Sequence, residues 1–95
     1  MQYRNEVITM KMKPEYLIQD IENTQYMVSI GNGVTNRIIR NNKTAAFIVN
    51  QLQEDTTVEK IVEAMCAKYD APREVIVADV EEILQLLRKV NALEE

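Results

Sequence analysis

The chain has 95 residues, enough for one small domain, and a net charge of −4. It contains no histidine and a single cysteine, Cys66, which excludes an internal disulfide and argues against zinc sites and histidine-activated nucleophiles. No apolar run approaches the roughly 18–20 residues that span a bilayer, and no signal peptide is recognisable. We therefore expect a cytoplasmic protein with no membrane contact, metal or other cofactor.

Other absences speak against an enzyme. The only glycines are Gly31 and Gly33, which cannot form a Walker loop or a dinucleotide fingerprint. The only serine, Ser29, lies in a strand-like segment and not at a helix start, where an acyl carrier protein needs one. No pair of carboxylates stands out from the others, so the sequence predicts no catalytic residue.

The first 13 residues are expected to form an N-terminal arm, either disordered or containing a short extra strand at Val7–Met10. The remaining residues, 14–95, form the predicted domain. Residues 16–21 and 26–30 are strand-like, separated by a polar break at 22–24, and predict a hairpin. A turn at residues 31–33 then leads to a third strand over residues 34–40, in which Ile38 and Ile39 face opposite sides.

The apolar period becomes helical after Asn42, which is a good N-cap for a first helix. Thr56 and Glu59 have the spacing of a capping box and predict the start of a second helix. Pro72 suits the first turn of a third helix, which is expected to end near Asn91. Three strands followed by three helices indicate an α+β fold, with an N-terminal three-stranded antiparallel sheet, similar to a winged helix-turn-helix.

The third helix carries more apolar surface than one core requires. A surface helix needs a stripe of roughly 100°, and the residues around Val80 already supply it. Val75, Leu86 and Val90 add a flank at about 80° to 140° from Val80, given 100° per residue. This flank either packs on the sheet or on residues 1–13, or it forms the wall of a groove. If the flank forms the wall of a groove, the third strand is the candidate sheet edge to which a peptide strand can be added.

Four segments resemble one family. Residues 42–48 (NKTAAFI) are similar to the helix start L-N-x-T-A-A-x-I-W of PqqD-like proteins, and residues 57–62 (TVEKIV) to T-V-E-E-I. Residues 68–70 (KYD) with 78–81 (ADVE) resemble Y-D-V followed by A-D-V, and residues 87–93 resemble the closing L-x-x-x-G-L-L. The resemblance covers about residues 11–95. It departs from the family at Asn41, at Val49 and at Asn91, where the family has an apolar residue, an aromatic residue and a glycine.

The resemblance to PqqD-like proteins implies a recognition element for ribosomally made precursor peptides. Such domains bind a leader peptide as an extra strand between the third strand and the third helix, and they present it to a modifying enzyme, often a radical S-adenosylmethionine maturase. The peptide-binding residues implied by the resemblance form two walls: Thr35, Arg37, Ile38 and Ile39 on the strand, and Val75, Asp79, Glu82, Leu86 and Val90 on the helix.

Two other functions stay open from the residues alone. A winged-helix DNA-binding regulator needs a basic recognition helix. The second helix carries Glu59 and Glu63 against Lys60 and Lys68, and the third helix is more acidic, so no nucleic-acid partner is expected. A small stabilising subunit of a larger enzyme is the other alternative. An exposed apolar groove can also close on a second copy of the chain, giving a homodimer.

Overall fold

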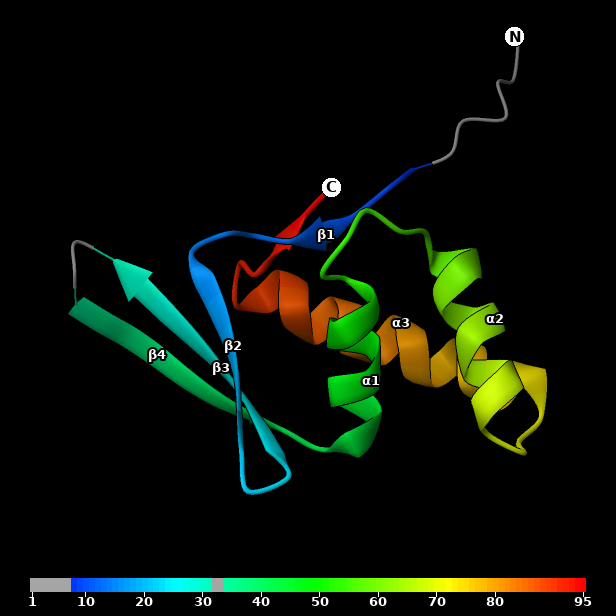
Figure 1. The fold of residues 1–95 in the computed structure, drawn as a ribbon. Helices are drawn as coiled ribbons and strands as arrows, with labels where there is room; N and C mark the ends of the chain where they lie inside the picture. The colour runs from blue at the N-terminus through cyan, green and yellow to red at the C-terminus, as the bar shows by residue number, and fades with distance from the viewer. Residues whose placement is uncertain (1–7, 32–33) are drawn as a thin grey trace, which may run out of the picture.

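The computed structural model describes residues 8–31 and 34–95, and the side chains of residues 34–36 lie outside this description. It has five strands and three helices within these residues, in an α+β arrangement (Figure 1). The strands are β1 (Lys11–Met12), β2 (Tyr16–Ile21), β3 (Thr24–Gly31), β4 (Val34–Asn41) and β5 (Leu93–Glu94). The helices are α1 (Lys43–Gln51), α2 (Val58–Lys68) and α3 (Arg73–Lys89). The predicted three-stranded antiparallel sheet and three helices are confirmed, and the short strands β1 and β5 are additional to the prediction.

The main sheet is antiparallel and has the order β2-β3-β4, which makes β4 an edge strand as predicted. Ile18, Met27 and Ile39 form one row across its three strands, and Leu17, Val28 and Ile38 form the next row on the opposite face. The first row faces the core, and the second faces outward. Strands β2 and β3 are joined by a two-residue turn in which Glu22 and Asn23 both have positive φ (51° and 66°), as a type I′ hairpin requires.

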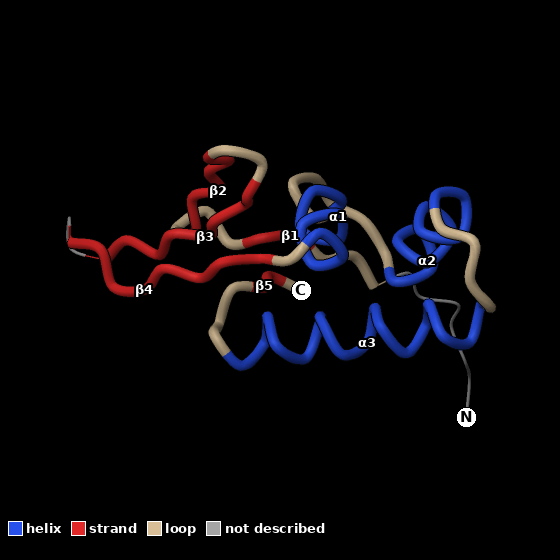
Figure 2. The backbone as a smooth tube through the Cα atoms, turned by 90° about the horizontal axis from the view of Figure 1, so that it is seen from below, coloured by secondary structure: helices blue, strands red, loops and turns tan. Residues whose placement is uncertain are grey.

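The helices lie to one side of the sheet, and β3 and β4 extend past them (Figures 1 and 2). Helix α3 runs below α1 and α2 in Figure 2, and its C-terminal end lies below the part of β4 nearest α1. The largest fully buried side chains come from β3 and from all three helices: Met27, Ile48, Val49, Leu52, Ile61, Val80 and Leu84. Burial of these aliphatic side chains, at roughly 25 cal/mol per Å² of apolar surface, is the main force that holds the sheet against the helices.

The N-terminal segment belongs to this core from Met10 onward. Met10 pairs with Thr56 in a single bridge, and β1 pairs with β5, so that residues 11–12 meet residues 93–94. Met10 is 2% exposed and Met12 is 7% exposed. Of the strand suggested at Val7–Met10, only Met10 takes part in pairing, and Val7 lies outside the described residues.

The ends of the helices confirm some of the predicted caps and correct one. The Asn42 side chain accepts a hydrogen bond from the Ala45 N–H (2.8 Å), as predicted for an N-cap. The prediction of Thr56 as the cap of α2 is wrong by one residue, since Thr57 accepts from the Lys60 N–H. Thr56 uses its own backbone N–H and carbonyl to pair with Met10, and the helix therefore begins after the next residue.

Helix α3 ends at Lys89, two residues before Asn91, near which the sequence predicted its end. Asn91 has φ 59°, its N–H donates to the Arg88 carbonyl, and the Ala92 N–H donates to the Leu87 carbonyl. These two bonds form a Schellman motif, in which the left-handed residue is usually glycine and sometimes asparagine. This motif explains how asparagine can occupy position 91, where the PqqD-like proteins that the sequence resembles have glycine.

Candidate functional site

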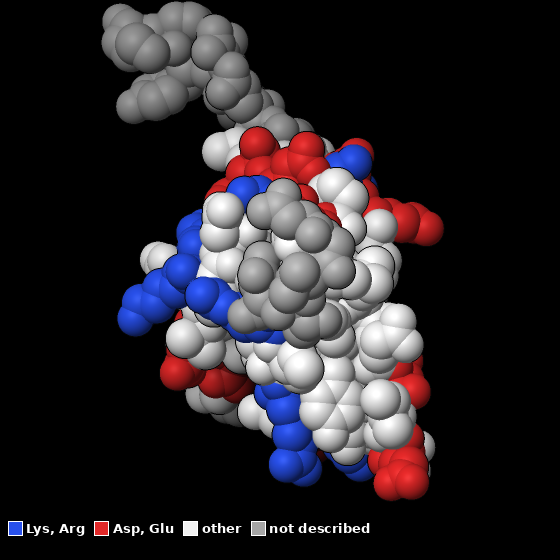
Figure 3. Space-filling view, turned by 90° about the vertical axis from the view of Figure 1, so that its left-hand side faces the viewer, with Lys and Arg blue, Asp and Glu red and all other residues white. Residues whose placement is uncertain are grey.

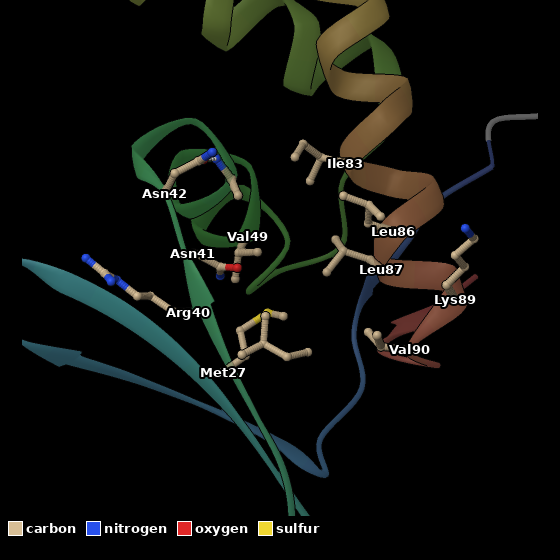
Figure 4. A pocket seen from close by; sticks show the side chains of 12 residues that line it. Met27, Arg40, Asn41, Asn42, Val49, Ile83, Leu86, Leu87, Lys89 and Val90 are labelled. Carbon is tan, nitrogen blue, oxygen red and sulfur yellow. Dashed lines mark hydrogen bonds between the residues drawn. The ribbon is translucent and has the colours of Figure 1, made fainter.

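A groove lies between the edge strand β4 and the C-terminal half of α3, and we call it the β4–α3 groove. Its centre is an apolar pocket of about 340 Å³. Ile39 of β4 and Met27 of β3 form one side, and Ile83, Leu86 and Val90 of α3 form the other. In Figure 4, Ile83, Leu86 and Leu87 point from α3 toward Val49, Asn41 and Met27. The pocket thus joins the apolar flank of α3 to an unpaired strand edge.

Two smaller hollows continue the groove at its ends. The hollow near α1 is lined by Asn42 and Thr44 on one side and by Asp79, Glu82 and Leu86 on the other. The hollow at the opposite end is lined by Arg37 and Tyr16 from the sheet and by Val90 and Asn91 after α3. The groove therefore follows β4 from Arg37 to Asn41 and has a polar hollow on each side of its apolar centre.

Hydrogen bonds tie the elements around the groove to one another. The Tyr16 hydroxyl donates to the Val90 carbonyl (2.6 Å), which ties β2 to the end of α3. At the other end, the Asn41 side-chain amide donates to Gln25 Oε1 (2.7 Å), and Gln25 Nε2 donates to Asn50 Oδ1 (2.9 Å). Gln25 is only 3% exposed, and this chain of amides links it to the half-buried Asn41 of β4 and the exposed Asn50 of α1. Buried polar groups with all partners present favour a single arrangement of the elements that carry them.

Two of the four strand-wall residues predicted from the sequence line the groove in the structure. Ile39 lines the apolar pocket and Arg37 lines the hollow beside Val90. Ile38 is 65% exposed on the outer face of the sheet, so it flanks the β4 edge without lining the groove. Thr35 lies in β4 opposite Ile30, and its side chain is outside the described part of the structure.

The helix-wall residues fall into two groups. Leu86 and Val90 line the apolar pocket, and Asp79 and Glu82 line the hollow near α1. Leu86 is 50% exposed, so the apolar flank of α3 is not covered by residues 8–13 or by the sheet at this position. Val75 is 47% exposed on the same flank but lines neither the pocket nor its two hollows, since it precedes Leu86 by about 16 Å along the helix axis.

Other lining residues were not named from the sequence. Ile83 and Leu87 belong to the stripe assigned to the core, yet each also borders the pocket. Ile83 lies three residues before Leu86, and Leu87 lies four residues after Ile83. Residues at these spacings are neighbours on a helix surface, and this spacing is the signal that could have identified them. Asn41 and Asn42 line the pocket where β4 leads into α1. No strand or helix periodicity in the sequence identifies residues at such a junction.

Within the ranges 8–31 and 34–95, no cluster of three or more His, Cys, Asp or Glu side chains is arranged to hold a metal ion. Across the same ranges, none of the helices combines the length and apolar character needed to cross a membrane.

Residues 15–93 match the family model described as "Coenzyme PQQ synthesis protein D (PqqD)". The chain belongs to the PqqD family. The match includes the whole β2-β3-β4 sheet, all three helices and Leu93, so both walls of the groove lie within the family's domain. The resemblance noted in the sequence is confirmed. No curated protein matches the sequence at a significant level.

Two solved structures share the fold of this PqqD-family chain. One is TbiB1 in complex with the TbiA(beta) leader peptide, with 23% identity, a TM-score of 0.77, and coverage of 88% of this chain and 94% of TbiB1. The other is lasso peptide synthetase B1 complexed with the leader peptide, with 16% identity and a TM-score of 0.76. That alignment covers 90% of this chain and 98% of the synthetase chain. At these identities the likeness establishes the fold.

Proposed function

We propose that this chain is a non-catalytic, cytoplasmic adaptor that binds the leader of a ribosomally synthesised precursor peptide. The leader adds a strand to the free edge of β4 and lies in the β4–α3 groove. The observation that carries the proposal is the placement of this edge directly opposite the half-exposed Leu86, across an apolar pocket. Strand addition of this kind uses backbone hydrogen bonds for affinity and side-chain pockets for specificity.

Family membership and the two similar structures support this proposal. Both of those proteins were solved with a leader peptide bound. We propose that the bound peptide contacts Ile39, Leu86 and Val90 in the centre, and Arg37, Asp79 and Glu82 toward the ends. Contacts of the peptide with Thr35, Ile38 and Val75 stay predictions from the sequence.

The leader would be presented to a separate modifying enzyme, such as a radical S-adenosylmethionine maturase. The groove contains carboxylates and cations but no histidine or cysteine, which suits binding better than catalysis. The winged helix-turn-helix resemblance stays a prediction. It does not favour DNA binding, because the exposed residues of α3 along the groove include Asp79 and Glu82, which repel phosphates.

Titration of the isotope-labelled protein with the precursor peptide encoded beside its gene tests the proposal. The amide resonances of residues 34–40 and 75–90 should shift most. Leu86→Gln should raise the Kd by about tenfold or more, because a leucine buried by the ligand contributes roughly 1.5–3 kcal/mol. Leu17→Gln is the matched control, since Leu17 is similarly exposed (44%) but lies on the outer face of the sheet.

Resonance shifts confined to α1 and α2 would contradict groove binding. The proposal also fails if Leu86→Gln and Leu17→Gln change the Kd equally. A thermal unfolding curve of each variant, recorded by circular dichroism, checks that the fold is retained.

A further inference from the structure

The two ends of the β4–α3 groove carry opposite charges. The hollow near α1 is lined by the carboxylates of Asp79 and Glu82 and by no Lys or Arg. At the other end, Arg37 lines the hollow, together with one carboxylate, Glu15. Lys89 stands on the adjoining rim of the pocket. Arg40 also borders the pocket, but its side chain points away from it, on the outer face of the sheet (Figure 4).

A further cation belongs to the basic end. Lys13 donates from its Nζ to Asn91 Oδ1 (2.6 Å), and Asn91 lines the hollow beside Arg37. Figure 3 looks at the molecule from this end and shows Lys and Arg side chains on the left and lower parts of this face, with Asp and Glu mostly toward its edges. The basic end therefore has three cations for one carboxylate, and the acidic end has two carboxylates.

These charges are available to a ligand. Asp79, Glu82, Arg37 and Lys89 are all exposed. The ion pairs found in the described part of the chain, Arg73–Glu63 and Arg88–Glu95, use none of them. An extended peptide lying in the groove would pass the acidic end, the apolar pocket and the basic end in turn.

The direction of the peptide follows from the directions of the walls. Strand β4 runs from Arg37 toward Asn41, and α3 runs the opposite way, from Asp79 toward Val90. Every strand pair in the main sheet is antiparallel, and antiparallel pairing is slightly more stable per residue than parallel pairing. A peptide strand added antiparallel to β4 therefore has its N-terminal half beside Asp79 and Glu82, and its C-terminal half beside Arg37.

We infer that the groove selects peptides by their charge order: basic side chains first, then apolar side chains at the pocket, then acidic side chains. This inference rests on the proposed function, since it names the class of peptide that the groove would accept. Alternate residues of an added strand point to opposite faces, so the apolar side chains that enter the pocket should be spaced two residues apart.

A library of random 15-residue peptides, displayed and selected on the immobilised full chain, tests the inference. The same selection on the Leu86→Gln variant gives the background. Peptides enriched on the unmodified protein should carry Lys or Arg before the apolar pair and Asp or Glu after it. In a second selection on Asp79→Lys/Glu82→Lys, the preference for basic residues before the apolar pair should disappear.

The Kd of one enriched peptide and of its variants measures how much the charge order contributes to binding. Exchanging its basic and acidic residues, with the composition unchanged, should weaken binding about two- to fivefold for each ion pair lost, and more at low salt than at high salt. Arg37→Glu should weaken binding of the original peptide by a similar factor. Equal Kd values for the original and exchanged peptides would overturn the inference.

The outcomes separate this inference from the proposed function. If the enriched peptides require Leu86 for binding but show no charge order, or the reverse order, the inference about charge order is overturned and groove binding stands. No enrichment over the Leu86→Gln background counts against both. Far-ultraviolet circular dichroism of each charge variant confirms that a change in selection is not caused by unfolding.

Discussion

The Tyr16 hydroxyl donates a 2.6 Å hydrogen bond to the Val90 carbonyl, across 74 positions of sequence. Val90 is the C-cap of α3 and one of the groove's lining residues, and Tyr16 begins β2. This bond therefore connects the sheet directly to the helix wall. It also satisfies a carbonyl at the helix end, where backbone acceptors have no partner within the helix.

Tyr16→Phe should lower the free energy of unfolding by about 0.5–1.5 kcal/mol, because the partly buried Val90 carbonyl loses its donor while the ring stays in place. Urea denaturation measures the change. Tyr26→Phe, on the outer face of the sheet, is the control and should stay within about 0.5 kcal/mol of the unmodified protein. Equal effects of the two substitutions would remove the basis for a structural role of this bond.

Gln25→Leu should lower the free energy of unfolding, although it places an apolar side chain at a buried position. Leucine fills a similar volume, but the half-buried Asn41 and the exposed Asn50 each lose the hydrogen bond to Gln25, and such a bond contributes about 0.5–1.5 kcal/mol. Chemical denaturation of Gln25→Leu and of Gln19→Leu, an exposed glutamine on β2, gives the comparison. A stable Gln25→Leu variant would show that the chain of amides is not needed to hold β4 to α1.

Removal of residues 1–13 should destabilise the domain strongly. Met10 and Met12 both belong to the core, and losing a buried methionine side chain costs about 2–5 kcal/mol. A chain that lacks only residues 1–7 keeps both methionines and is the matched control. If the two shortened chains unfold at the same temperature, the pairing of the N-terminal segment with Thr56 and β5 contributes little to stability.

The Arg88–Glu95 pair adds a small pH dependence. The hydrogen bond from Arg88 lowers the pKa of Glu95, and the pairing raises the pKa of Arg88. A lowered carboxyl pKa gives stability that is fully present above the unfolded-state pKa of about 4.3 and is lost as the pH falls through the folded-state value.

Because the pair is exposed, this contribution should be at most about 1 kcal/mol. Glu95→Gln should be less stable than the unmodified protein at pH 7 and should lose less stability between pH 6 and pH 3. Unfolding curves across this range measure both quantities. A stability difference that is independent of pH would contradict the ion-pair explanation.

The sequence predicts the elements well where periodicity and local chemistry agree. The alternation of Tyr26, Val28 and Ile30 predicts β3. The expectation that Ile38 and Ile39 face opposite sides agrees with the structure, in which Ile38 is exposed and Ile39 is partly buried. Asn42 is identified as a cap because a side-chain oxygen at a helix start satisfies a free N–H. The wide apolar arc of α3 indicates a groove wall, and Leu86 is indeed half exposed.

Pairing between distant segments is what the sequence does not reveal. Nothing in Lys11–Met12 indicates that it pairs with Leu93–Glu94, and this pairing, with the Met10–Thr56 bridge, also moves the start of α2 from Thr56 to Thr57. Gln25 looks like an ordinary polar residue, and its burial depends on amides supplied by Asn41 and Asn50. An apolar flank alone also does not show where the opposite wall ends, and Val75 lies on the flank of α3 without lining the pocket or its two hollows.

The two walls of the β4–α3 groove come from parts of the chain that are far apart in sequence, around Ile39 and around Leu86. The groove therefore exists only in the folded state, and a ligand of the groove has no equivalent site on the unfolded chain. Folding and ligand occupancy then form one linked equilibrium: a peptide at 100 times its Kd adds about 2.7 kcal/mol to the free energy of unfolding. For a domain of this size, each kcal/mol raises the melting temperature by roughly 4–8 °C, so occupied and empty protein would differ clearly in their survival of heat.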